Sequence, residues 1–75
     1  MIFTNNGGDS LVSYEPLWRT LEEKGINQYR LVRYYNFSPG QLSRIKHGEH
    51  ISTRTVDKLC AILDCQVDDI FEIIN

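Results

Sequence analysis

The apolar residues of this chain recur at intervals of three and four positions, the spacing that places side chains on one face of a helix. The first such set follows Ser13 and comprises Tyr14, Leu17, Trp18 and Leu21. Pro16 suits the first turn of this helix, because a proline there removes no internal hydrogen bond. Gly25 can adopt the left-handed conformation that commonly ends a helix. The pattern predicts a helix that ends at Gly25 and has Trp18 in the core.

A second, shorter helix is predicted between Asn27 and Asn36. Asn27 is a good N-cap, since its side chain can accept a hydrogen bond from a free amide of the first turn. Ile26 before this cap and Leu31 after it are placed to pack as a hydrophobic staple. Asn36 tolerates a left-handed backbone, so we expect the helix to stop before it.

The third helix has the strongest start signal in the chain. Ser38 is a cap, Pro39 takes the first helical position, and Gln41 completes a Ser-x-x-Gln capping box. Leu42 is expected to point inward, and Gly48 to end the segment.

Two more helices are expected after Gly48. Ser52 is placed to cap the fourth, whose apolar stripe is Val56, Leu59, Cys60 and Leu63. Asp68 and Asp69 would favour the positive N-terminal end of a fifth helix. That helix would carry Ile70, Phe71, Ile73 and Ile74.

No alternation of apolar and polar residues, the pattern of a half-buried strand, is visible in the sequence. We therefore predict an all-α fold of five short helices. A chain of 75 residues is long enough for one core and too short for two. The opening MIFTNNGGDS is polar and has no period, so residues 1–12 are interpreted as a flexible tail and residues 13–75 as the domain.

The composition agrees with a folded protein, because 41% hydrophobic residues are too many for intrinsic disorder. The sequence contains neither a membrane-spanning apolar run nor a secretory signal pattern, which favours a cytoplasmic protein. The net charge of −2 is unevenly distributed. Residues 27–54 hold five Lys and Arg residues against Glu49 alone, a net charge of +4. This basic block can form a footprint for an anionic partner.

Two short helices joined through Tyr35-Asn36-Phe37 form a helix-turn-helix pattern. The run from Asn27 to Gly48 resembles the helix-turn-helix of the Cro and phage-repressor (XRE) family of lambda-repressor-like DNA-binding domains. Gln28 opens the second helix of this pattern and Ser38 caps the third. The similarity extends over about residues 14–74. It implies a small, repressor-like transcriptional regulator that binds double-stranded DNA with its third helix in the major groove.

Helix geometry identifies the expected base-reading residues. If Leu42 and Ile45 face the core, the outward face of the third helix carries Ser43 and Arg44, with Gln41 beside it. Arg44 can donate twice to a guanine, Gln41 can pair with an adenine, and Ser43 can contact either base. The resemblance further implies DNA-backbone contacts, for which the matching residues are Gln28, Ser38, Lys46, His47 and Arg54.

The sequence departs from the family pattern in two places. Asn36 stands where the family usually has glycine, which is tolerable because asparagine is the next best left-handed residue. Pro39 and Gly40 stand where relatives often carry base-contacting side chains, and neither offers a side-chain donor. Base reading is therefore expected to rest on fewer residues.

Other functions receive less support. His47, His50, Cys60 and Cys65 are side chains of zinc-binding type, but Cys60 belongs to an apolar stripe and the spacing is poor, so no metal or cofactor is expected. No phosphate-binding loop or catalytic triad pattern is present, which argues against an enzyme.

Two alternatives stay open at this point. The helix-turn-helix scaffold can serve as a protein-interaction module in place of a DNA-binding domain. The four apolar residues of the C-terminal helix cannot all fit one stripe, so that helix can mediate a homodimer. Three aromatics near Phe37 are expected to fill the core or its rim in preference to stacking on bases; they are Tyr29, Tyr34 and Tyr35.

Overall fold

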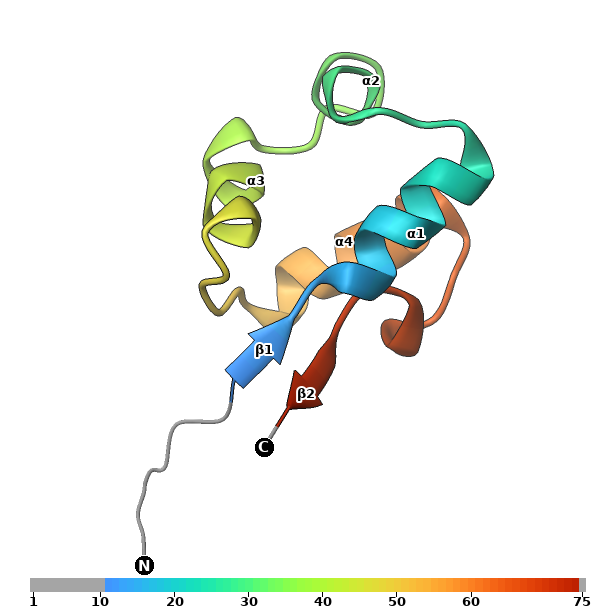
Figure 1. The fold of residues 1–75 in the computed structure, drawn as a ribbon. Coiled ribbons are helices and arrows are strands. Elements are labelled where there is room, and N and C mark those ends of the chain that lie inside the picture. Colours follow the sequence, from blue (N-terminus) through green and yellow to red (C-terminus); the bar gives the residue numbers. More distant parts are fainter. Residues whose placement is uncertain (1–10, 75) are drawn as a thin grey trace, which may run out of the picture.

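The structure, a computed structural model, describes residues 11–74, and these form four α-helices, one 3-10 turn and two short strands (Figure 1). In chain order the elements are β1 (Leu11–Ser13), α1 (Glu15–Lys24), α2 (Gln28–Arg33), α3 (Pro39–Lys46), α4 (Thr53–Leu63), η2 (Val67–Asp69) and β2 (Glu72–Ile74). The first four predicted helices are confirmed. The fold is mostly helical, with a helix-turn-helix formed by α2 and α3.

Local capping signals explain where the middle helices begin. Asn27 accepts the Arg30 amide at 2.8 Å, Ser38 accepts the Gln41 amide at 3.3 Å, and Ser52 accepts the Thr55 amide at 3.2 Å. Each bond satisfies an amide that has no partner inside its helix. The three predicted caps are confirmed, and they set the start of α2, α3 and α4.

Left-handed residues end the helices and form the turn, as predicted. Gly25 follows α1 with a φ of 69°, Gly48 follows α3 with a φ of 72°, and Asn36 lies in the α2–α3 turn with a φ of 59°. Asp64 ends α4 in the same conformation, with a φ of 51°. Asparagine and aspartate adopt this conformation more readily than other residues with a side chain.

The apolar stripes of the four helices meet in one core. Its buried members are Tyr14, Leu17, Leu21, Leu31, Phe37, Leu42, Ile45, Val56, Leu59, Leu63 and Ile70. Trp18, which the pattern places in the core, is only partly buried and packs against the core from outside. Thr20 of α1 is also buried, and its hydroxyl donates to the Asp69 carbonyl at 2.9 Å, which ties α1 to η2.

The predicted fifth helix is wrong. Asp68 and Asp69 lie in the single 3-10 turn η2, and Glu72–Ile74 form strand β2. β2 pairs antiparallel with β1, so that Leu11 faces Ile74 and Ser13 faces Glu72 (Figure 1). Strands of three residues are too short to show an alternating pattern, and their partners are about 60 positions apart in sequence. The fold is therefore not purely α.

Strand β1 also changes the predicted start of ordered structure. Leu11 and Val12, which we assigned to the tail, belong to the sheet. Residues 1–10, the rest of the predicted tail, lie outside the described residues.

The tyrosines near the turn are not core residues, contrary to expectation. Tyr29, Tyr34 and Tyr35 are 66%, 67% and 40% exposed. Helix α2 has only six residues, and the one it buries is Leu31. With a single inward position on so short a helix, the aromatics around it point to the surface. The Arg30 guanidinium lies over the Tyr34 ring, and its Cζ atom is 5.3 Å from the ring centroid. This is a cation–π contact.

Candidate nucleic-acid interface

The turn between α2 and α3 is held from three sides. The Phe37 side chain after the turn is 1% exposed and anchors α3 to the core. The Phe37 amide donates to the Leu31 carbonyl at 3.1 Å, which closes the turn onto α2. Lys58 of α4 donates its ammonium to the Asn36 carbonyl at 3.2 Å. The position of α3 relative to α2 is thus fixed by packing and by two hydrogen bonds.

Helix α3 buries one face and exposes the other, as helical geometry predicts. Leu42 and Ile45 are 7% and 2% exposed, whereas Ser43, Arg44 and Lys46 lie on the surface. The exposed face includes two cations and a hydroxyl, groups that can donate hydrogen bonds to base edges or phosphates.

Gln41 is less free than the sequence implies. It is half-buried, and its side-chain oxygen accepts a hydrogen bond from the Thr55 hydroxyl at 3.4 Å. Its amide group, a two-proton donor, has no bond among the described residues. The predicted capping box is therefore only half formed. The Ser38 hydroxyl accepts the Gln41 amide, but the Gln41 side-chain oxygen accepts from Thr55 of α4 and not from the Ser38 amide.

Arg44 is paired with Glu49, a residue that the sequence reasoning did not single out. The Arg44 Nη1 lies 3.3 Å from the Glu49 Oε1, and both side chains are more than half exposed, at 56% and 54%. Glu49 follows Gly48, so a signal existed in the sequence: the residue after a C-terminal glycine folds back over the last turn of a helix.

The residues predicted to contact the DNA backbone lie on three helices. Gln28 is the first residue of α2 and is half-buried, and Ser38 is the cap of α3. Lys46 and His47 end α3, where the His47 Nδ1 lies 2.7 Å from the Ser43 carbonyl oxygen. Arg54 is exposed in the first turn of α4. The Gln41–Thr55 bond brings the starts of α3 and α4 together, whereas no hydrogen bond within residues 11–74 joins Gln28 to α3.

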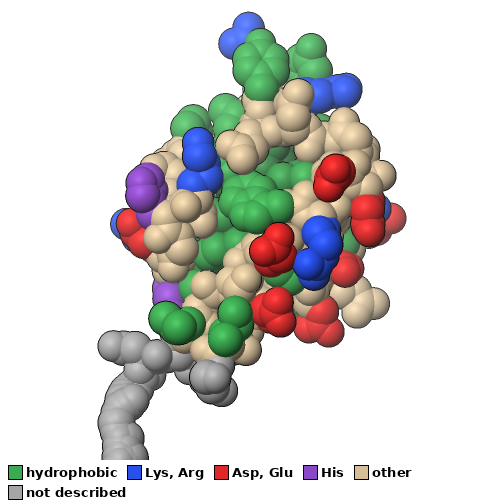
Figure 2. Space-filling view, viewed as in Figure 1, with side chains coloured by type: hydrophobic (Ala, Val, Ile, Leu, Met, Phe, Trp, Pro, Cys, Tyr) green, Lys and Arg blue, Asp and Glu red, His purple; other side chains and the backbone are tan. Residues whose placement is uncertain are grey.

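The charges are unevenly distributed on the face of the molecule that Figure 2 shows. On the face shown, acidic side chains gather over α1 and the C-terminal turn, and the histidines lie on the side of α3. The +4 segment thus contributes its cations to α2, α3 and the start of α4. These elements carry an excess of positive charge, so they attract an anionic ligand more than the acidic segments before and after them.

The cysteines and histidines are not brought together. His47 and His50 lie near the start of α4, and Cys60 and Cys65 lie near its end. Burial raises the pKa of both thiols, that of Cys65 to about 11. Within residues 11–74, no three His, Cys, Asp or Glu side chains are arranged to hold a metal ion. No helix in this range is long and apolar enough to cross a membrane.

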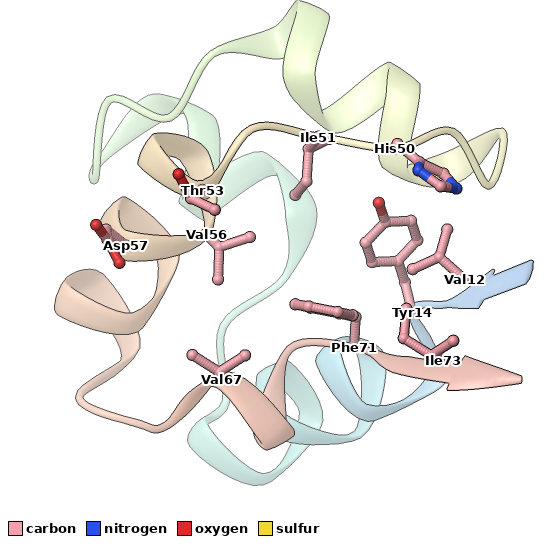
Figure 3. Close-up of a pocket in the computed structure, with 10 residues that line it drawn as sticks. All are labelled: Val12, Tyr14, His50, Ile51, Thr53, Val56, Asp57, Val67, Phe71 and Ile73. Carbon is pink, nitrogen blue, oxygen red and sulfur yellow. The ribbon is translucent and has the colours of Figure 1, made fainter. Parts of the chain in front are cut away.

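An apolar hollow of about 200 Å³ lies beside the two-stranded sheet (Figure 3). Strand β1, the start of α4, η2 and the approach to β2 surround it. Its lining consists of Val12, Tyr14, His50, Ile51, Thr53, Val56, Asp57, Val67, Phe71 and Ile73. Leu11, Ile73 and Ile74 are 68%, 50% and 47% exposed. The sheet and the hollow form an apolar surface that shares no residue with the outward face of α3.

Comparisons with known proteins agree with this architecture. The sequence profile of a family described as the Cro/C1-type HTH DNA-binding domain matches residues 16–75. The crystal structure of the transcriptional regulator VanUg is similar to this chain, with a TM-score of 0.80 and 23% sequence identity. The similarity covers 99% of this chain and 93% of that one, and at this identity it supports the fold. No curated protein matches the sequence.

Proposed function

Because the chain belongs to the family of Cro/C1-type helix-turn-helix DNA-binding domains, we propose that it binds double-stranded DNA sequence-specifically, as a small repressor-like transcriptional regulator. The exposed face of α3 carries this proposal. It presents Ser43 and Arg44 on a helix that is fixed to the core by Leu42, Ile45 and the capped turn. A rigid exposed helix of this kind fits the major groove. Binding to chromosomal DNA would place the protein in the cytoplasm, on the nucleoid.

In this proposal Arg44 is the principal base reader, opposite a guanine. Its exposed guanidinium has donors beyond the one directed at Glu49, and a bidentate contact to guanine is the commonest specific contact in the major groove. Ser43 is exposed beside it, and Gln41 contributes its amide group from the edge of the interface.

Phosphate contacts are assigned to residues on the rim of the same surface. Lys46 and His47 lie at the end of α3, and Arg54 lies in the first turn of α4. Gln28 and Ser38 lie at the starts of α2 and α3, where free backbone amides favour anions.

The first experiment selects binding sites from random duplex DNA and then measures affinity across a salt series. A duplex-binding protein loses affinity steeply with salt, because phosphate contacts release counterions. Binding to no duplex at roughly 50 mM salt would contradict the proposal. In that case the alternative of a protein-interaction module would gain weight. The surface to test would be the exposed Tyr29 of α2 and the exposed Tyr34 that follows this helix.

The second experiment compares Arg44→Ala with Arg54→Ala on the selected site and on a scrambled duplex. If Arg44 reads a guanine, its removal should cost about 1–3 kcal/mol on the selected site and relax preference at that base pair. Removal of Arg54 should weaken binding to both duplexes alike and reduce the salt slope by about one. Equal losses of Arg44→Ala on both duplexes would show that Arg44 contacts only phosphate.

We also propose that the apolar surface beside the sheet binds a second copy of the chain. The predicted dimer element was a helix, and its place is taken by β2, whose Ile73 and Ile74 are about half exposed beside the hollow. A two-fold contact there would present two α3 helices to half-sites about 34 Å apart.

Light scattering at high concentration, with and without DNA, tests this contact. Ile73→Lys should shift the mass from dimer to monomer, while Tyr29→Lys, a change at a comparably exposed residue of α2, should not. A monomeric mass for the unmodified protein under both conditions would refute the dimer.

A further inference from the structure

The ion pair between Arg44 and Glu49 is a consequence of how α3 ends. The Gly48 amide donates to the Ile45 carbonyl at 3.0 Å, and the Glu49 amide donates to the Arg44 carbonyl at 2.9 Å. These two bonds, with Gly48 in the left-handed conformation, define a Schellman motif. This motif brings the second residue after the cap against the third-last residue of the helix, often as an apolar contact. Here the two residues are Glu49 and Arg44, and the contact is ionic.

The backbone of Glu49 is anchored from a second direction. The Tyr14 hydroxyl donates to the Glu49 carbonyl, and Tyr14 itself is 5% exposed. Glu49 is thus tied to Arg44 through its amide and to the core through its carbonyl. These bonds fix the backbone from which the Glu49 carboxylate reaches the guanidinium, so less backbone entropy is lost when the pair forms.

The pairing leaves Arg44 able to recognise a base but less attractive to phosphate. Glu49 engages Nη1, so Nη2 and Nε of the same planar fork stay available for two parallel hydrogen bonds. The adjacent carboxylate offsets part of the positive charge of the guanidinium and repels a phosphate that approaches it. A guanine edge is neutral overall and offers two acceptors, so it is disfavoured much less.

We propose that Glu49 is a positioning residue for base recognition, which directs Arg44 toward a guanine and away from the DNA backbone. The inference rests on the proposed DNA binding, and it adds a residue that makes no direct contact with a base. It predicts a division of effects. Loss of Glu49 should strengthen binding to DNA in general and weaken discrimination between sequences.

The test measures Glu49→Ala on the selected site and on a duplex in which the guanine pair read by Arg44 is replaced. Discrimination between the two should fall by a factor of about 1.5 to 5, the range that an exposed ion pair contributes. Affinity for the replaced duplex should rise, and its salt slope should steepen by up to about one as Arg44 gains a phosphate. Glu49→Gln, which keeps an acceptor oxygen without the charge, should restore part of the discrimination.

Two further variants separate positioning from net charge. Asp64→Asn removes the same charge at the far end of α4, and asparagine tolerates the left-handed conformation that this position requires. It should leave discrimination unchanged. In an Arg44→Ala background, Glu49→Ala should no longer alter discrimination, because the residue through which it acts is missing.

The outcomes distinguish the role of Glu49 from the role of Arg44 and from DNA binding itself. Reduced discrimination with Glu49→Ala that vanishes in the Arg44→Ala background supports the proposal. A uniform gain in affinity on both duplexes, with or without Arg44, would mean that Glu49 contributes only negative charge, and would overturn it. If Arg44→Ala alone lowers affinity for both duplexes equally, the assignment of Arg44 as base reader fails first, and the role of Glu49 fails with it. Absence of any duplex binding would refute the proposed function itself.

Discussion

The hydrogen bond from Tyr14 to Glu49 connects the start of α1 to the end of α3, 35 positions apart. Tyr14→Phe removes the hydroxyl and leaves the aromatic ring in place. Tyr14 is only 5% exposed, so the ring belongs to the core. The apolar packing of the core is therefore unchanged by the substitution. What is lost is one bond between a buried donor and a carbonyl at the edge of the candidate interface.

The expected cost follows from these surroundings. A net hydrogen bond of this type contributes about 0.5–1.5 kcal/mol. Glu49 is exposed, so water can solvate its carbonyl once the hydroxyl is gone, which limits the additional penalty of an unpaired acceptor. We expect the free energy of unfolding to fall by about 1 kcal/mol, which in a domain of this size lowers Tm by about 4–8 °C.

The dependence on pH provides a second check. Burial raises the pKa of Tyr14 above its ordinary value of 10.0. Because the pKa of Tyr14 is higher in the folded state than in the unfolded state, the protonated hydroxyl contributes to the free energy of unfolding. This contribution is complete below pH 10 and is lost as pH rises through the raised pKa. The difference in stability between the wild type and Tyr14→Phe should therefore be constant near neutral pH and should shrink above pH 10.

Urea denaturation followed by circular dichroism measures both effects. Tyr29→Phe is the matched control, because its side chain is 66% exposed and removal of its hydroxyl should change stability by less than about 0.5 kcal/mol. If Tyr14→Phe is as stable as Tyr29→Phe at pH 7, the bond to Glu49 does not stabilise the fold, and the anchoring of Glu49 inferred from it is wrong.

Two other predictions concern the glycine within α3, the glycine that follows this helix, and the two cysteines. Gly48→Ala should lower the free energy of unfolding by about 1 kcal/mol in thermal melts, because its φ of 72° is strained for alanine. Gly40→Ala should leave it unchanged or raise it by about 0.5 kcal/mol, since the added Cβ meets the Ser38 Oγ at an ordinary 3.6 Å; a loss comparable to that of Gly48→Ala would refute this reasoning. Cys60 and Cys65 should react slowly with a maleimide at pH 7 in the folded protein and faster in urea, because burial raises both pKa values. The same shifts predict that the contribution of the two protonated thiols to the free energy of unfolding is complete below pH 9. It should be lost as pH rises toward the Cys65 pKa of about 11. A free energy of unfolding that does not depend on pH across this range would contradict the prediction.

The four helices and the helix-turn-helix could be predicted from the sequence. Caps such as Ser38, left-handed residues such as Gly48 and the inward Leu42 act over a few positions, so a local pattern is enough to predict them. The outward face of α3 follows from the same periodicity. The pairing of Glu49 with Arg44 could also have been predicted from the sequence, because the helix-ending motif that creates it involves only residues 44–49.

The sheet and the contacts around the interface depend on tertiary packing and could not be predicted from local patterns. β2 is a strand because β1 pairs with it from the other end of the chain, and three residues carry too little pattern to reveal a partner so distant. The bonds from Thr55 to Gln41 and from Lys58 to Asn36 join separate helices, so they depend on how α4 packs against the turn. The exposure of the α2 tyrosines has the same origin, since local periodicity identifies an apolar side chain but not whether another element is there to cover it.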